Sequence, residues 1–309
     1  MRKHISLLLA LVLLCTAFVA CDKGTIDPAD DPANVIVDNR GVTLHAADFK
    51  RVVCAYASYS DLWLKAGGKL VGVTDDVEER GIDAGKAKLI GSVKTPSLEK
   101  IVDLKPDFVI LSADIDGQIA LDEQLTALKI PHGYFTADTF PQYGQLAEKF
   151  LKLTGNVNNA DLWNALVRAP SDQILAANEK TKDKKAPSVL LLRVTSTDFK
   201  VKRTGTVAAS ILDDLGVNNI ADSDKKLLET LSVEKIVQLQ PDWILLDVMG
   251  IDETQAQESF DKLRKDQPAW DSLSAVKDGK VKVLPKDLFH YKPNERWGES
   301  YAFLADVLF

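Results

Sequence analysis

The 309-residue chain has few cysteines, three in all, and no two of them form a Cys-x-x-Cys pair. This excludes a zinc knuckle, a zinc ribbon and a thioredoxin-type redox pair. Basic residues are outnumbered, with 38 Lys and Arg against 45 Asp and Glu and a net charge of -7. A nucleic-acid-binding protein needs a basic face, so this charge argues against one. The GxSxG, GxGxxG, P-loop and HExxH motifs are missing as well, and we expect no enzyme.

The N-terminus has an apolar run too short to span a bilayer. The run covers 5–20 and follows two basic residues, whereas a spanning helix needs about 20 residues. A basic start and a short apolar core are typical of a signal peptide, which we assign to residues 1–20. The letters FVAC at 18–21 resemble a bacterial lipobox, in which Cys21 becomes the lipidated first residue, although Phe18 replaces the usual Leu. An ordinary signal peptide followed by a chance cysteine is the alternative.

Residues 21–40 have the composition of a flexible tether. The segment starts with a stretch that is acidic, holds Pro28 and Pro32 and lacks apolar periodicity. A lipid on Cys21 would hold a folded domain at the cell membrane, facing the periplasm or the extracellular side. Because acylation uses Cys21 and cleavage removes Cys15, Cys54 stands alone, and we expect it to be a small buried apolar residue.

Composition and patterning of the remaining chain predict an α/β fold. Apolar residues make up 46% and charged residues 27%, close to a soluble globular average. Short apolar runs alternate with helical patterns, which indicates mainly parallel sheets. Between two such regions, 154–186 has helical spacing of its apolar residues, with an interruption expected near Pro170. We therefore expect an N-terminal α/β lobe over 41–153, a linking helix, and a C-terminal α/β lobe over 187–309.

An internal repeat relates the two lobes. SLEKIVDLKPDFVIL at 97–111 and SVEKIVQLQPDWILL at 232–246 share nine of fifteen residues. Such self-similarity indicates repeated structure. Each copy predicts a Ser N-cap, a short helix, a Pro-Asp stop and a buried strand.

These features resemble the helical-backbone class of ABC-transporter substrate-binding proteins, which includes binders of ferric siderophores, haem and cobalamin. The segments 62–75, 270–281 and 294–298 and both E-K-I-V-x-L-x-P-D copies carry the resemblance. It implies two Rossmann-like lobes joined by one long helix, and a monomer without a resident cofactor. Its ligand would be captured between the lobes and delivered to a permease dimer with its ATPase subunits. A ferric siderophore is the leading ligand, haem or cobalamin is the alternative, and a sensor or adhesion lipoprotein on the same fold is the third reading.

Ligand contacts are expected in loops at the carboxyl ends of the strands. In the first lobe these loops hold Tyr56, Ser58, Tyr59 and Arg80. Packing is the alternative for the tyrosines, and pairing with a neighbouring glutamate is the alternative for Arg80.

In the second lobe arginines are the more informative residues, because nine Arg stand against 29 Lys in the chain. Arg suits bidentate recognition of carboxylates or planar anions, and Lys does not replace it. The expected contacts of this lobe are Arg193, Arg203, Met249, His290, Tyr291 and Arg296. Surface ion pairs are the alternative for each arginine. His290 is a possible ligand to haem or iron or a hydrogen-bonding group, although a lone His is more often neither.

Glu99 and Glu234 occupy matching positions of the repeat, early in matching helices. The resemblance implies that an acidic residue on each lobe docks with arginines of the two permease subunits. The alternative is that each carboxylate stabilises its own helix N-terminus through the helix dipole.

Overall fold

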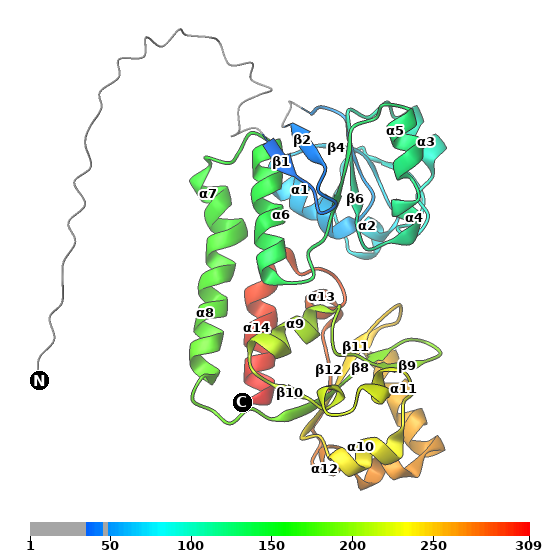
Figure 1. Ribbon diagram of the computed structural model, residues 1–309, viewed down its shortest axis with the longest axis vertical. Coiled ribbons are helices and arrows are strands. Elements are labelled where there is room, and N and C mark those ends of the chain that lie inside the picture. Colours follow the sequence, from blue (N-terminus) through cyan, green and yellow to red (C-terminus); the bar gives the residue numbers. More distant parts are fainter. Residues whose placement is uncertain (1–34, 46–48) are drawn as a thin grey trace, which may run out of the picture.

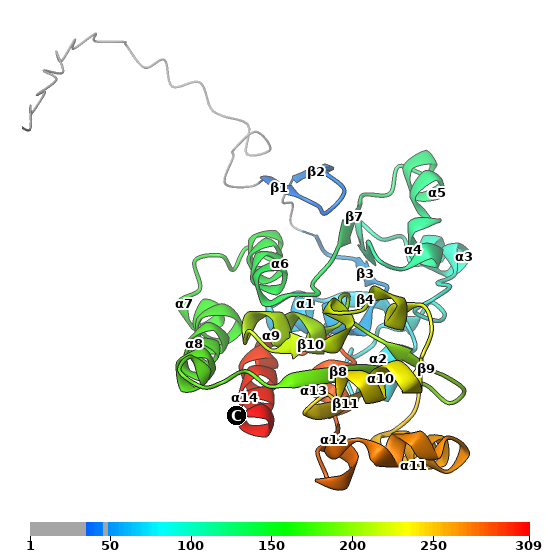
Figure 2. The same cartoon turned by 60° about the horizontal axis from the view of Figure 1, so that its bottom comes forward.

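The computed structural model describes residues 35–45 and 49–309. The expected signal peptide, Cys21 and most of the expected tether lie outside the described residues. Two sheets stand one above the other beside a column of helices (Figure 1). A second view keeps the column on one side of both sheets (Figure 2). No helix in the described ranges is both long and apolar enough to cross a membrane.

The N-terminal lobe is built on a five-stranded parallel sheet of order β5-β4-β3-β6-β7. Its strands are β3 (Val52–Cys54), β4 (Leu70–Val73), β5 (Lys88–Leu89), β6 (Phe108–Ser112) and β7 (His132–Phe135). Its helices are α1 (Ala57–Lys65), α2 (Asp76–Glu79), α3 (Leu98–Asp103), α4 (Asp116–Ile119), α5 (Asp122–Ala127) and α6 (Phe140–Leu153). Consecutive parallel strands need a long connection, usually a helix, between them. The lobe shows the alternation of strands and helices that the sequence predicted.

The C-terminal lobe repeats this plan with the parallel order β10-β8-β11-β12. Its strands are β8 (Ser188–Val194), β9 (Phe199–Val201), β10 (Asn218–Asn219), β11 (Trp243–Val248) and β12 (Val281–Val283). Its helices are α9 (Val207–Asp214), α10 (Val233–Leu239), α11 (Glu253–Asp266), α12 (Ser274–Lys277) and α13 (Lys286–Phe289). The short β9 pairs antiparallel with β8, which the sequence did not predict.

The helical column contains α7 (Ala160–Trp163) and α8 (Ala169–Thr181), joined by a π-helical turn, Asn164–Arg168. The final helix, α14 (Trp297–Leu308), packs along α8. The interruption expected near Pro170 is therefore a widened turn and not a break. The amide of Ala169 donates to the carbonyl of Asn164, five residues back. Pro170 then falls in the first turn of α8, where its missing N–H matters least.

One hydrophobic core extends through both lobes. Alternate residues of the central strands, Val52, Cys54 and Leu191 among them, belong to a single buried cluster that also includes residues of α6, α8, α9 and α14. The intervening residues, such as Val53 and Leu192, face two smaller clusters on the outer sides of the sheets. Cys54 is a buried free thiol, as expected. The helices of the column thus share one apolar core with both sheets, and this close packing favours a fixed arrangement of the lobes.

The beginning of the described chain is bound to the N-terminal lobe. Strands β1 (Val35–Val37) and β2 (Thr43–His45) form an antiparallel hairpin. At its turn the buried carboxylate of Asp38 accepts hydrogen bonds from the amides of Arg40 and Val42 at 2.9 Å and of Tyr134 at 3.0 Å. The tether expected over 21–40 therefore does not extend to residue 40.

The repeat has the predicted structure in both copies. Ser97 and Ser232 each accept a hydrogen bond from the amide three residues on, at 3.3 Å, and so cap α3 and α10. After each helix, the aspartate of the Pro-Asp pair holds the start of the neighbouring strand. Asp107 accepts from the amide of Arg51 at 2.9 Å, and Asp242 accepts from the amide of Ser188 at 2.7 Å.

A strap of residues 290–296 leaves α13, crosses to the N-terminal lobe and leads into α14. Asn294 is 2% exposed and has a φ of 53°. Its side-chain amide donates to the carbonyl of Ser58 at 2.9 Å and to Asp61 Oδ2 at 2.8 Å, both near the start of α1. Asn tolerates this left-handed conformation better than most residues, so Asn294 both turns the strap and binds it to the other lobe.

Replacement of Asn294 by Ala should lower the free energy of unfolding by about 2–4 kcal/mol, because two hydrogen bonds are lost and Ala disfavours a positive φ. Asn294→Gly loses the same bonds without the conformational cost, so its stability should lie between those of wild type and Asn294→Ala. Urea unfolding followed by tryptophan fluorescence measures both. Equal stabilities of the Gly and Ala variants would contradict the conformational part, and wild-type stability of both would contradict the whole.

Candidate ligand-binding site between the lobes

Charged and aromatic side chains from both lobes meet where the strap crosses. We call this set the interlobe cluster; its members are Arg80, Arg193, Lys202, Lys286, His290 and Tyr291. Arg80 comes from the end of α2 and the others from the C-terminal lobe and the strap. Four of the six, Arg80, Arg193, His290 and Tyr291, were expected ligand contacts, whereas Lys202 and Lys286 were not predicted from the sequence.

Arg80 is the contribution of the N-terminal lobe. Its Nη1 donates to Ser58 Oγ at 2.7 Å, and its guanidinium carbon lies 4.9 Å from the centre of the Tyr291 ring. The Lys286 ammonium lies 5.4 Å from the same ring. Glu79 pairs with Lys286 at 2.5 Å and not with its sequence neighbour Arg80. That hydrogen bond from Lys286 lowers the pKa of Glu79.

Arg193 and Asp247 form a partly buried ion pair at the ends of two adjacent strands. They are register partners in β8 and β11. Nε and Nη2 of Arg193 donate to Asp247 Oδ2 at 3.0 and 2.6 Å, and Nη1 lies 3.9 Å from the sulfur of Met249. Met249, expected to contact the ligand, therefore packs beside the expected arginine. Burial raises the pKa of the Asp247 carboxyl, and the charge of Arg193 opposes that rise.

Lys202, and not its neighbour Arg203, joins Arg193. The amide of Lys202 donates to the carbonyl of Leu191. Two residues earlier, Lys200 lies directly opposite Arg193 in the antiparallel register of β9 and β8. Side chains two apart share a face of a strand, so Lys202 lies on the face of Arg193. Burial and the nearby Arg193 charge lower the pKa of Lys202.

Arg203 points elsewhere. Its Nε donates to Asp222 at 2.5 Å and its Nη1 to Asp213 at 3.3 Å. The structure does not bring it into the interlobe cluster. Arg203 was expected as a ligand contact because of its residue type. If β9 had been predicted, the alternation of side chains along the strand would have indicated Lys202 instead.

His290 lies among cations. Burial lowers its pKa to about 4, and the positive charges of Arg193 and Lys286 add to the effect. The imidazole is therefore neutral at pH 7, with its ring centre 5.0 Å from that of Tyr291. Its Nδ1 is buried and has no hydrogen-bond partner among the described residues. A neutral imidazole with a free nitrogen can donate to or accept from a ligand.

The remaining expected contacts of the first lobe lie deeper. Tyr59 is 1% exposed and its hydroxyl donates to the carbonyl of Phe135 at 3.0 Å, an arrangement typical of a packed core residue. Tyr56 is less buried and meets the Tyr59 ring edge-on at 4.9 Å. Ser58 is buried, and its contact with Arg80 links it to the interlobe cluster.

Arg296 lines a hollow of about 350 Å³ between the lobes. Its guanidinium is bonded to Glu299 at 2.9 Å. Arg80 forms part of the same wall, and Lys65 crosses the lobe boundary to Glu295 at 2.7 Å. The hollow thus adjoins the interlobe cluster through Arg80.

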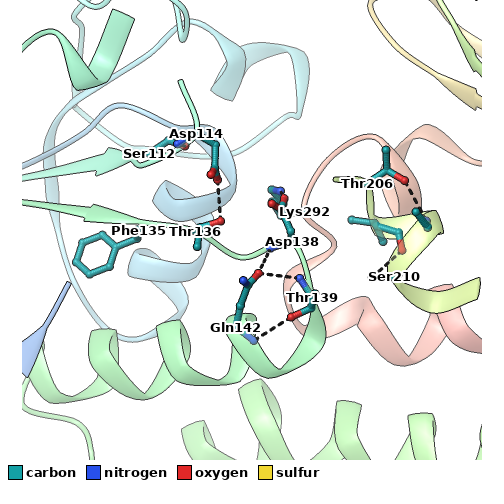
Figure 3. A network of polar contacts seen from close by, with 12 residues as sticks. Ser112, Asp114, Phe135, Thr136, Asp138, Thr139, Gln142, Thr206, Ser210 and Lys292 are labelled. Carbon is teal, nitrogen blue, oxygen red and sulfur yellow. Dashed lines mark hydrogen bonds and ion pairs between the residues drawn. The ribbon is translucent and has the colours of Figure 1, made fainter. Parts of the chain in front are cut away.

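A second polar group crosses between the lobes nearer the helical column (Figure 3). Lys292 of the strap bonds Asp138, whose amide donates to Gln142 Oε1 at 2.8 Å. Figure 3 shows this pair between Asp114 with its partner Thr136 on one side and Thr206 of the C-terminal lobe on the other. None of these residues was among the ligand contacts expected from the sequence.

Glu99 and Glu234 are exposed at the second positions of α3 and α10. Ser232 Oγ approaches Glu234 Oε2 at 3.3 Å, a local contact consistent with a role at the helix start. Their carboxylates remain accessible to solvent on the two lobes.

Comparison with known proteins agrees with this architecture. The family model described as periplasmic binding protein matches residues 52–288. The chain belongs to this family. It is 24% identical over 300 residues to the Fe(3+)-citrate-binding protein YfmC of Bacillus subtilis, covering 93% of this chain and 90% of that one. It is 27% identical over 256 residues to the iron(3+)-hydroxamate-binding protein FhuD of the same organism, covering 78% and 76%.

Solved structures agree in fold. Staphylococcus aureus SirA complexed with staphyloferrin B superposes with a TM-score of 0.67 at 20% identity, covering 88% of this chain and 97% of that one. The periplasmic haem-binding protein RhuT of Roseiflexus sp. RS-1 gives 0.64 at 21%, covering 84% and 97%. The expected two-lobe substrate-binding fold is confirmed. The protein is a solute-binding protein and not an enzyme.

The pKa of His290 predicts a pH dependence of stability. Its folded pKa of about 4 lies below the unfolded value of 6.5, so the neutral form favours the folded state. That contribution is complete above pH 6.5 and is lost as pH falls towards 4, by at most about 3 kcal/mol because solvent screens part of it.

The variant His290→Gln should therefore lose less stability than wild type between pH 7 and pH 4.5. Urea unfolding of both proteins at the two values measures the difference. Other groups, such as the Asp122 carboxyl with its pKa lowered to about 2, act equally in both proteins. If wild type and variant lose the same free energy of unfolding, the folded protein does not lower the pKa of His290.

Proposed function

We propose that the protein captures an anionic ferric complex, a carboxylate-type siderophore or ferric citrate, between its lobes and delivers it to the permease of an ABC importer. The observation that carries the proposal is the convergence of Arg80, Arg193, Lys202 and Lys286 from two lobes. Their neighbours Glu79 and Asp247 offset part of this charge. Four cations against two carboxylates leave a local excess of positive charge.

This charge favours a complete chelate over a bare ion. Guanidinium and ammonium groups are donors without lone pairs for a metal, and they repel a trivalent cation. They bind carboxylate oxygens well, because charge-assisted hydrogen bonds are about twice as strong as neutral ones. Iron would therefore enter with its oxygen ligands already in place, and the protein would bind the ligand oxygens.

The relatives favour an iron complex as the solute. One is named for Fe(3+)-citrate, a second for iron(3+)-hydroxamate, and a structural neighbour holds staphyloferrin B. A further relative, 22% identical over 311 residues, is described as a probable siderophore-binding lipoprotein. Together with the FVAC letters at 18–21, that name supports lipid anchoring through Cys21 at the outer face of the membrane.

Haem is the second candidate. The observation in its favour is the neutral imidazole of His290, whose Nδ1 has no hydrogen-bond partner within residues 35–45 and 49–309. Structural neighbours include haem-binding proteins. Four nearby cations fit haem less well than a small polyanionic chelate, since the porphyrin face is apolar.

Ferric citrate should quench the tryptophan fluorescence of the purified protein, and Arg193→Ala or Arg80→Ala should weaken its affinity about 10- to 150-fold. The reason is the loss of one charge-assisted contact, about 1.5–3 kcal/mol. Arg264→Ala, which removes an arginine paired with Asp271 on the outside of the same lobe, is the control and should bind as wild type.

Two outcomes would contradict this proposal. Unchanged affinity in both cluster variants would remove the arginines from the site. Binding of haem with a Soret band shift that depends on His290, with no response to ferric citrate or carboxylate siderophores, would establish the second candidate instead.

Delivery gives a separate prediction. We propose that Glu99 and Glu234 contact the two permease subunits, because they are exposed at matching positions of the two lobes. The double variant Glu99→Ala/Glu234→Ala should abolish uptake of labelled ferric complex by cells while its affinity in solution stays unchanged. Charges at the edge of an interface mainly affect how fast and in which orientation two proteins meet, so their loss should not disturb the fold or the ligand site.

The matched control is Glu123→Ala/Glu258→Ala, which removes one exposed carboxylate from another helix of each lobe. It should transport as wild type. Normal uptake by the Glu99/Glu234 variant, or loss of its ligand affinity, would count against a docking role.

A further inference from the structure

We propose that Asp247 is a positioning residue, which holds Arg193 in the orientation that contacts an anionic ligand; the inference rests on the proposed function for its ligand. Asp247 is a buried carboxylate at the carboxyl end of β11, 0% exposed. A buried carboxylate beside a site for anions should weaken binding, and its presence needs a compensating role.

The backbone places the two residues together. β8 and β11 are parallel neighbours, and Arg193 and Asp247 are opposite each other in their register. Two positions earlier, Leu191 and Leu245 are likewise register partners and belong to the core shared by the lobes. Side chains on one face recur every second residue, so the pair lies on the continuation of that core-facing row, at its open end.

The contacts of Asp247 go to Arg193. Its Oδ2 accepts from both Nε and Nη2 of the guanidinium, at 3.0 and 2.6 Å. Its Oδ1 is buried without a hydrogen-bond partner among the described residues. The carboxylate thus holds one edge of the guanidinium, while Nη1 remains beside Met249 with a contact of 3.9 Å, too weak to occupy it.

The repeat shows that the fold does not require an acid here. Alignment of 97–111 with 232–246 places Ser112 opposite Asp247. Ser112 is also buried at the end of its strand. The register of β6 with its neighbour β3 ends at Ile110 and Cys54, and two residues further on the chain has Tyr56 and not an arginine beside Ser112. The aspartates that the copies do share, Asp107 and Asp242, accept from backbone amides instead. An acid therefore accompanies the arginine in one lobe and is missing with it in the other.

The test is a double-mutant cycle with ferric citrate as the probe. Asp247→Asn should weaken binding at least ten-fold in the wild-type background, because Arg193 loses its anchor. In the Arg193→Ala background the same change should alter affinity less than two-fold. Asp271→Asn, which breaks the Arg264 pair at the outer surface (2.7 Å), is the matched control and should leave affinity unchanged.

Unchanged or tighter binding by Asp247→Asn would overturn the proposal, since the carboxylate would then only repel the ligand. Equal weakening in both backgrounds would overturn it as well, because Asp247 would act on the fold and not through Arg193. Asp247→Ser, which introduces the residue of the related copy, is the second variant. If neither variant folds, the role is structural and the proposal is wrong.

A readout without ligand separates this inference from the proposed function. The Nε–H resonance of Arg193, assigned by its loss in Arg193→Lys, should be sharp and slow to exchange in wild type and broadened in Asp247→Asn. Failure of the wild type to bind ferric citrate would contradict the proposed function alone, and the resonance would still decide the inference. A resonance equally sharp in both proteins would show that Asp247 does not order Arg193.

Discussion

The two-residue period of the central strands is the constraint on which the site depends. In each lobe, one face of the sheet packs into the core shared with α8 and α14. The same face, continued to the carboxyl end of the strand, faces the lobe boundary. Leu191 is thus followed on its face by Arg193, and Leu245 by Asp247. Core packing fixes the register, because a slip of one residue would send these charges to the outer face.

The strap then determines how the lobes face each other. Asn294 binds it to α1, and ion pairs of Lys286 with Glu79 and of Lys292 with Asp138 span the boundary on either side. A ligand that binds Lys286 has to replace Glu79 as its partner. The anionic groups of such a ligand must therefore bind Lys286 more strongly than the Glu79 carboxylate does. Because α8 and α14 belong to one buried cluster with strands of both sheets, we expect this exchange to proceed by small movements of side chains and strap and not by a wide hinge.

Much of the architecture could be predicted from the sequence because it depends on local patterns, such as the repeat, the helix caps and the apolar runs. The repeat gave two lobes, and its Ser caps and Pro-Asp stops have the predicted contacts. The expectation of contacts at the carboxyl ends of strands pointed to Arg193, which is the second-last residue of β8. Asp247 and Lys202 depend on which strands are neighbours and on the register of the short β9, neither of which a single sequence reveals. For the same reason Arg203, one residue from Lys202, was chosen for its chemistry although it faces two carboxylates of its own.

The net charge of -7 opposes an anionic ligand only at long range, whereas the proposed site depends on the charges close to the ligand. At physiological ionic strength, charges more than about 8 Å apart at the surface are largely screened. The ligand therefore responds mainly to the groups that it touches, where cations outnumber carboxylates. Partial burial of Arg193 and Lys202 reduces screening there and strengthens each contact. Under the proposed function, the interlobe cluster is therefore the part of the protein that favours an anionic chelate, although the chain as a whole is acidic.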